Sequence, residues 1–261
     1  MLLFSVIILA IIQGLTEFLP VSSSGHLILL PKILHLKNFG LAFDAFLHLG
    51  TLFAVVIYFR KDIVNLLKGF LQIDKQYSKI SYAILFATMP VVLIGFTFKS
   101  FFASTFIRSV DCVAYTLILG AILIYIAEKF YQKNEDMQNL SIMQIFFIGL
   151  MQCLALFPGM SRSGTTIAAG IFMGLKKDEA ARFSFLLGLP AIAGAGLLAL
   201  KDMYEAQSLE LDLVSLFLAF FVSFIAGFIA IDFLLKFLKQ ASLSVFVIYR
   251  ILMAILLLLL F

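Results

Sequence analysis

The chain alternates long apolar runs with short polar stretches, and hydrophobic residues follow one another continuously within each run. Six runs approach the about 20 residues that a helix needs to cross the hydrocarbon core of a bilayer: 41–59, 80–98, 110–127, 183–200, 213–231 and 245–261. Only helices and closed barrels satisfy every backbone hydrogen bond in lipid, and barrel strands alternate in polarity. The pattern therefore predicts an all-α integral membrane protein, with one membrane domain over residues 1–261.

Two further apolar regions are interrupted by polar residues. Residues 2–19 run into a polar break at 20–26 and resume at 27–36, and residues 140–157 run into a break at 158–166 and resume at 167–175. The flanks that follow the breaks are too short to cross a membrane alone. We therefore expect two re-entrant pairs of half-helices, whose irregular turns are tolerated only where protein or water surrounds them.

The two breaks are also related in sequence. A shift of 139 residues aligns seven identities in sixteen ungapped positions: Gln13 with Gln152, Leu15 with Leu154, Phe18 with Phe157, Ser22 with Ser161, Ser24 with Ser163, Gly25 with Gly164 and Ile28 with Ile167. Four of these pairs are polar residues or glycine, which an apolar composition alone does not produce. We expect an internal repeat, with one copy over about residues 1–130 and the other over about 140–261.

Three predicted spans separate the breaks, so the two copies enter from opposite faces of the membrane. Such inverted-topology repeats place a polar site near the bilayer midplane. Twelve Lys and Arg residues fall on one side of this arrangement and five on the other. Because cytoplasmic loops are enriched in positive charge, we expect both termini outside the cell, with the cleft opening to the outer, periplasmic face.

Composition excludes several classes of protein. The chain is 63% hydrophobic and 13% charged, with a mean hydropathy of +1.11, whereas soluble domains are about 45–50% apolar and about 25% charged. A soluble enzyme, a disordered chain and a disulfide-stapled secreted domain are therefore poor interpretations. The net charge of +4 comes from scattered Lys and Arg residues, so we predict the lipid bilayer as a partner and no nucleic acid.

The first break carries candidate acid–base chemistry. Gln13 and Glu17 are four residues apart and share one face of a helix. A carboxylate at membrane depth is costly and is a functional candidate by default. Ser23 and His26 follow within nine residues, so Glu17 or His26 is the predicted proton acceptor. Asp44 and His48, one turn apart, are interpreted as a polar helix face near the cleft mouth, with a structural role preferred.

The second break has the composition of an anion site. Arg162 offers a planar fork of donors for phosphate, and the start of a half-helix carries partial positive charge. With the serines of the first break, its hydroxyls and glycine form the predicted phosphate cradle: Ser22, Ser24, Ser161, Ser163, Gly164, Thr165 and Thr166. Arg250 also lies inside an apolar run, and Asp232 is one candidate partner for it.

Taken together, Gln13-Gly-Leu-Thr-Glu-Phe-Leu-Pro-Val-Ser-Ser-Ser-Gly-His26 and Pro158-Gly-Met-Ser-Arg-Ser-Gly-Thr-Thr166 resemble the undecaprenyl-diphosphate phosphatase family, the bacterial bacitracin-resistance proteins. The resemblance covers essentially the whole chain. It implies a hydrolase of the bacterial cytoplasmic (inner) membrane that converts a polyprenyl diphosphate lipid to its monophosphate. That reaction recycles the carrier for cell-wall synthesis and confers bacitracin resistance.

The resemblance also implies the roles of individual residues. By motif position, Glu17, Ser23, His26 and Arg162 become the catalytic candidates. The family is described as dependent on a divalent cation, Mg²⁺ or Ca²⁺, and Gln13 and Glu17 are the candidate ligands. Because Gln13 is neutral, Glu17 would supply the only negative charge of that pair.

Some alternatives stay open at this point. Ser23 could attack the terminal phosphorus, or Glu17 could activate water directly. An inverted-repeat lipid flippase or a secondary transporter for an anionic substrate is the rival class, because it uses the same architecture. A purely structural subunit would not need Glu17, His26 and Arg162. The sequence leaves the oligomeric state undetermined, with a homodimer as one alternative.

Overall fold

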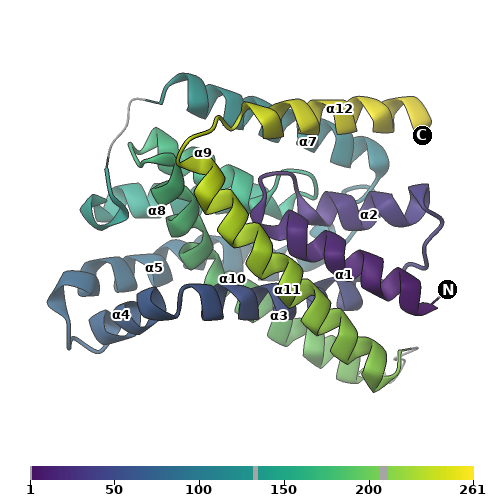
Figure 1. Cartoon of the computed structure of the whole chain (residues 1–261), viewed down its shortest axis with the longest axis horizontal. Coiled ribbons are helices and arrows are strands. Elements are labelled where there is room, and N and C mark those ends of the chain that lie inside the picture. The colour runs from purple at the N-terminus through teal and green to yellow at the C-terminus, as the bar shows by residue number, and fades with distance from the viewer. Residues whose placement is uncertain (1, 132–134, 206–210) are drawn as a thin grey trace.

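The protein folds into a bundle of helices that run broadly along one direction (Figure 1). The structure, a computed structural model, describes residues 2–131, 135–205 and 211–261. In these ranges the helices are α1 (Leu2–Phe18), α2 (Ser23–Ile33), α3 (Leu41–Tyr58), α4 (Arg60–Phe70), α5 (Lys75–Thr97), α6 (Lys99–Phe102), α7 (Val110–Lys129), α8 (Ile142–Met151), α9 (Arg162–Phe172), α10 (Lys177–Glu205), α11 (Leu213–Leu238) and α12 (Ser244–Leu260). Two 3₁₀ helices, η1 (Met137–Asn139) and η2 (Gln152–Leu156), flank α8.

Five of the six predicted spans form helices long and apolar enough to cross a membrane, namely α3, α5, α7, α10 and α11. The sixth, predicted at 245–261, forms α12. Its 17 residues extend about 26 Å at the helical rise of about 1.5 Å per residue, slightly less than the hydrocarbon core. The chain is thus an all-helical, multi-pass membrane protein, with five long apolar helices and several shorter ones in the ranges that the structure describes.

The two interrupted regions form helical hairpins, α1–α2 and α8–η2–α9. In the first, the Lys37 amide, beyond the end of α2, donates to the Ser5 hydroxyl near the start of α1 (3.3 Å). In the second, the Glu135 amide, before α8, donates to the Gly174 carbonyl, after α9 (2.9 Å). Each hairpin therefore begins and ends at the same end of the bundle, which is the arrangement a re-entrant pair requires.

The polar breaks are shorter than predicted, because their serines begin the second helix of each hairpin. Helix α2 begins at Ser23 rather than after His26, and α9 begins at Arg162. The caps are alike: the Ser22 hydroxyl accepts from the Gly25 amide and the Ser161 hydroxyl from the Gly164 amide, with φ angles of 75° and 71°. Serine at this position satisfies amides that a helix start leaves without partners. Most of each polar motif is therefore a helix N-terminus.

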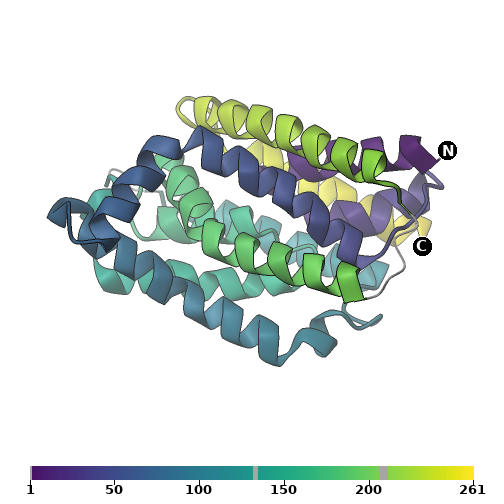
Figure 2. The same cartoon turned by 90° about the horizontal axis from the view of Figure 1, so that it is seen from below.

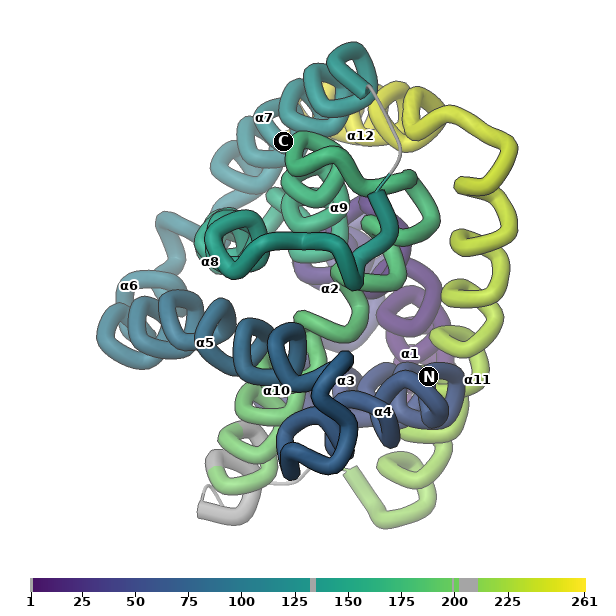
Figure 3. Tube along the Cα trace, turned by 90° about the vertical axis from the view of Figure 1, so that its left-hand side faces the viewer, coloured from purple at the N-terminus to yellow at the C-terminus, as the bar shows by residue number. Residues whose placement is uncertain are grey.

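The second helix of each hairpin lies inside the bundle. Viewed end-on, α2 and α9 occupy the middle, with longer helices around them (Figure 3). Helix α1 packs on α11, α8 on α5 and α9 on α10. Helix α1 begins and α12 ends at the same end of the bundle, opposite α4 (Figures 1 and 2).

Arg250 of α12 joins the two hairpins. Its side chain is fully buried and, among the described residues, donates to main-chain carbonyls alone: Leu117 (3.1 Å), Pro20 (3.1 Å), Thr116 (3.4 Å), Gly159 (2.8 Å) and Met160 (3.1 Å). Pro20 belongs to the first break, and Gly159 and Met160 to the second. Asp232, the partner suggested by the sequence, instead pairs with Lys236 (2.7 Å).

We expect Arg250→Met to destabilise the protein by more than about 3 kcal/mol, since each buried carbonyl that loses its partner costs about 1–3 kcal/mol. The measurement is the unfolding midpoint in detergent. The control is Arg60→Met, because Arg60 is exposed and donates to one carbonyl, that of Ile57 (3.2 Å). Equal midpoints for the two variants would contradict the clamping role of Arg250.

Candidate active site

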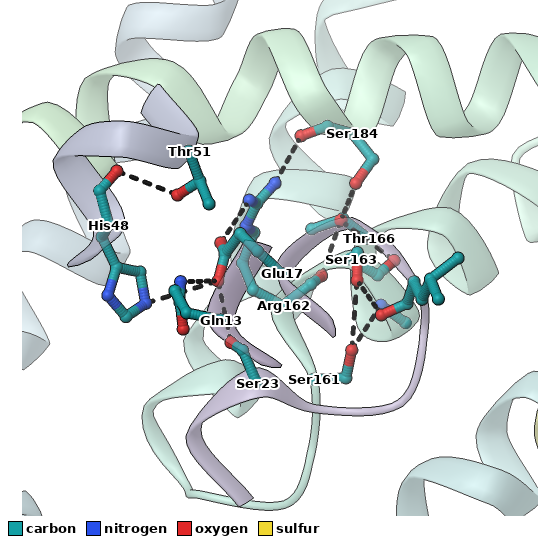
Figure 4. Close-up of polar contacts among 12 residues, drawn as sticks. Gln13, Glu17, Ser23, His48, Thr51, Ser161, Arg162, Ser163, Thr166 and Ser184 are labelled. Carbon is teal, nitrogen blue, oxygen red and sulfur yellow. Dashed lines mark hydrogen bonds and ion pairs between the residues drawn. The ribbon is translucent and has the colours of Figure 1, made fainter. Parts of the chain in front are cut away.

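The two hairpin turns contact each other directly (Figure 4). Arg162 Nη2 lies 2.8 Å from Glu17 Oε1 in a mostly buried ion pair. The Gly159 amide donates to the Ser22 hydroxyl (3.0 Å), and the Ser163 hydroxyl donates to the Leu19 carbonyl (3.1 Å). An acid of the first half and a guanidinium of the second therefore meet at one point.

Glu17 is the centre of this cluster. Its Oε2 accepts hydrogen bonds from Gln13 Nε2 (3.0 Å) and Ser23 Oγ (2.8 Å), and it lies 3.3 Å from His48 Nε2. Gln13 lies one turn earlier on the same face of α1, as the spacing predicted. Both carboxylate oxygens are thus held in place by donors from four different helices.

His48 joins the site although sequence reasoning favoured a structural role for it. Its Nδ1 lies 2.8 Å from the Asp44 carbonyl, which can only accept, so Nδ1 carries a hydrogen. A proton is then also required between Nε2 and Glu17 Oε2, because two lone pairs would repel each other there. The Asp44 carboxylate pairs with Arg108 (3.5 Å) instead. His48 reaches Glu17 because α3 packs on α1, and no local sequence pattern predicts that contact.

His26, predicted as a catalytic candidate, faces away from Glu17. Its Nδ1 is 2.7 Å from the Ser22 carbonyl and its Nε2 2.6 Å from the Tyr249 hydroxyl. The His26 and Tyr249 rings are nearly parallel, with an interplanar angle of 6° and centroids 5.7 Å apart. Both nitrogens are therefore occupied, and in this structure the imidazole holds α2 against α12.

The three guanidinium nitrogens of Arg162 differ in their hydrogen bonds. Nη2 binds Glu17, and Nη1 donates to the Ser184 carbonyl of α10 (3.1 Å). Nε is buried and has no hydrogen-bond partner among the described residues. Because guanidinium donors prefer phosphate and carboxylate oxygens, this free donor suits an anion in the adjacent cavity.

The predicted phosphate cradle divides into two groups. Ser22, Ser24 and Ser161 line a cavity together with Glu17, Ser23, His48 and Arg162. Ser163, Gly164, Thr165 and Thr166 do not line it. Instead, the Thr165 and Thr166 hydroxyls donate to the Arg162 carbonyl (3.0 and 2.7 Å), and Thr166 also contacts the Ser184 hydroxyl (2.6 Å). This second group supports the turn that presents Arg162.

The cavity has a volume of about 570 Å³, and its walls are polar at one end and largely apolar elsewhere. Beyond the polar end, its lining is largely apolar and comes mainly from α5, η2 and α10: Val91, Val92, Gly95, Phe96, Ala155, Leu156, Ala191, Ile192, Ala195 and Leu198; Lys99 of α6 also lines it. Phe96 is also 76% exposed on the outer surface of the bundle. The cavity can therefore hold a polar head while an apolar tail passes towards lipid.

A divalent cation would find oxygen ligands beside Glu17. Gln13 Oε1 is buried and lacks a hydrogen-bond partner among the described residues. Within the same ranges, no group of three or more His, Cys, Asp or Glu side chains is arranged to hold a metal. Mg²⁺ is commonly held by one or two carboxylates together with substrate phosphates. Glu17 and Gln13 fit a cation that a bound diphosphate would help to hold.

We expect Gly188→Ala to reduce activity by displacing Arg162. A Cβ at Gly188 would lie 2.3 Å from Arg162 Nη1, so the guanidinium would have to move, and a misplacement of about 1 Å can cost about 100-fold in rate. The measurement is turnover in detergent. The control is Gly196→Ala on the same helix, where a Cβ would meet the Leu49 side chain and not Arg162. Equal turnover in the two variants would contradict this position of Arg162.

Fold and site together define a multi-pass membrane protein with a buried acid–serine–arginine centre at the polar end of an otherwise apolar cavity. The chain belongs to the bacitracin resistance protein BacA family, whose profile matches residues 6–256. It is also 41% identical over 255 residues to the undecaprenyl-diphosphatase of Alteromonas mediterranea (strain DSM 17117 / CIP 110805 / LMG 28347 / Deep ecotype), with 96% of this chain and 95% of the relative aligned.

Proposed function

We propose that the protein is an undecaprenyl-diphosphatase of the bacterial cytoplasmic membrane. It hydrolyses undecaprenyl diphosphate to undecaprenyl phosphate and phosphate, which recycles the lipid carrier for cell-wall synthesis and confers bacitracin resistance. Family membership and the activity named for the relative support this function. The observation that carries it is the convergence of Glu17, Ser23 and Arg162 at the polar end of a cavity with apolar walls.

The diphosphate binds where the two helix starts meet. The N-termini of α2 and α9 direct partial positive charge and amide donors at this point, and Arg162 adds a full charge. The terminal phosphoryl group lies against Arg162 and Ser161. The prenyl chain leaves along the apolar wall of α5 and α10 towards lipid.

Ser23 is the nucleophile that the contacts favour, because its hydroxyl already donates to Glu17 Oε2 (2.8 Å). Ser23 Oγ forms a bond to the terminal phosphorus as the bridging P–O bond breaks and undecaprenyl phosphate leaves. The hydroxyl proton passes to the Glu17–His48 pair. Water then attacks the phosphoserine, and the reaction releases phosphate and regenerates the hydroxyl. If Glu17 instead activates water directly, no phosphoserine forms. Trapping phosphoserine at Ser23 in a single turnover distinguishes the two routes.

Charge stabilisation supplies most of the rate in phosphoryl transfer, and here Arg162 and the helix starts provide it. A divalent cation held by Glu17, Gln13 Oε1 and the diphosphate oxygens would neutralise further charge on the phosphates. Glu17 orients Ser23, and the support from Thr166 and Ser184 keeps Arg162 aimed at the same place.

We also propose that the chain is an inverted repeat. Adding 139 to the bounds of α2 gives 162–172, which are the bounds of α9, and adding it to those of α5 gives 214–236, within α11. The helix packing follows the same symmetry. Helix α1 of the first half packs on α11 of the second half, and α8 of the second half packs on α5 of the first half. The excess of positive charge near α4 supports an orientation with both termini outside and the cleft open to the outer face.

Release of phosphate by purified protein in detergent tests this function. Transport needs two compartments, whereas hydrolysis does not, so a lipid flippase or secondary transporter would release no phosphate there. We expect phosphate release from a prenyl diphosphate, reduced by EDTA if the cation site is occupied during turnover. Purified, folded protein that releases none would contradict the proposal.

A further inference from the structure

Gln152 is a buried polar side chain that the proposed mechanism does not use. It is 1% exposed, and neither its amide nitrogen nor its amide oxygen has a hydrogen-bond partner among the described residues. Gln13, its counterpart in the aligned breaks, differs in this respect because its amide nitrogen donates to Glu17 (3.0 Å). A buried amide without partners is unfavourable, so its presence points to a ligand.

The position of Gln152 indicates which part of a ligand it would meet. It is the first residue of η2, where α8 tightens into a 3₁₀ helix. Side chains three residues apart on a 3₁₀ helix lie on one face, and both Gln152 and Ala155 line the cavity. Helix η2 packs between α9, which carries Arg162, and α5, which carries the apolar wall. Gln152 therefore lies where the polar end of the cavity meets the apolar part.

We propose that Gln152 binds the phosphate that carries the prenyl chain, the one retained in the product. This inference rests on the proposed function, which places the terminal phosphate against Arg162 and the chain along α5. Gln152 Nε2 donates to a non-bridging oxygen of the lipid-side phosphate. Its Oε1 cannot accept from an ionised phosphate, so it accepts from a water bound to that phosphate. Gln152 thus contributes to affinity for prenyl phosphates and not for inorganic phosphate.

The test compares Gln152→Leu with wild-type protein in detergent, with farnesyl diphosphate as the substrate. Losing a hydrogen bond to a charged group should raise KM about 10- to 100-fold, with kcat changed much less. Farnesyl phosphate should raise the unfolding midpoint of wild type but not of the variant, whereas inorganic phosphate should act equally on both. The packing control is Thr88→Val on α5, because Thr88 is buried and donates only to the Ile84 carbonyl (2.8 Å).

An unchanged KM, or unchanged stabilisation by farnesyl phosphate, would overturn the assignment, as would a lower kcat at constant KM. If the leucine variant does not fold, Gln152→Glu keeps the size of the side chain and places a carboxylate beside the phosphate. Its KM should rise further, and a wild-type KM would again overturn the assignment. Wild-type protein that releases no phosphate contradicts the proposed function instead, while the farnesyl phosphate comparison still tests Gln152.

Discussion

Arg162→Ala should slow phosphate release by about 100- to 1,000-fold, which corresponds to about 3–4 kcal/mol of transition-state stabilisation. Arg162 holds the Glu17 carboxylate at 2.8 Å, lines the cavity and has a buried Nε donor without a partner among the described residues. Its loss removes the main positive charge from the transferring phosphoryl group. The measurement is kcat/KM for a prenyl diphosphate in detergent.

Arg162→Lys separates the charge from the geometry. Lysine keeps the charge but cannot form the planar fork, so it should restore folding better than it restores turnover. The unfolding midpoint must be measured in parallel, because breaking a buried ion pair can cost about 3–5 kcal/mol of stability. An alanine variant with near-wild-type turnover would show that Arg162 is not the phosphate-binding group.

Glu17→Gln should reduce turnover by about 1,000-fold or more, because a positioned acid–base group contributes about 100- to 10,000-fold and the change also frees Arg162 and His48 from their shared carboxylate. Glutamine keeps the size of the side chain and can still accept from Ser23, so folding should be affected less than activity. The measurement is single-turnover phosphate release.

Asp232→Asn is the matched control for Glu17→Gln, because Asp232 is a membrane-domain carboxylate outside the site, paired with Lys236 (2.7 Å). It should retain wild-type turnover. Substantial residual activity in Glu17→Gln would move the proton acceptor to another residue. His48, at 3.3 Å from Glu17, would then be the first candidate.

The features that could be predicted from the sequence are those that a local pattern of residues determines. Apolar run length predicted the long helices, and the two polar breaks predicted two helical hairpins. The identities between the breaks pointed to two related hairpins, and Glu17 of the first lies against Arg162 of the second. The fold differs mainly at the helix starts, because the serine hydroxyls cap α2 and α9 and lengthen them into the breaks.

Contacts between distant helices could not be predicted. His26 is near Glu17 in sequence, yet its ring faces Tyr249 (2.6 Å), while His48 reaches Glu17 from α3. Arg250 binds carbonyls, which carry no sequence signature, so the search for an acidic partner suggested Asp232 wrongly. Thr165 and Thr166 have the right chemistry for phosphate, but buried backbone groups take their hydroxyls.

A double-substitution cycle tests most directly whether the front-half acid and the back-half guanidinium serve one reaction centre. Phosphate release would be compared for wild type, Glu17→Gln, Arg162→Ala and the double variant. If both groups act on the same phosphoryl transfer as a unit, the double variant should be about as slow as the slower single variant. Rate losses that multiply, giving a double variant slower by the product of the two single effects, would show that Glu17 and Arg162 work at separate places.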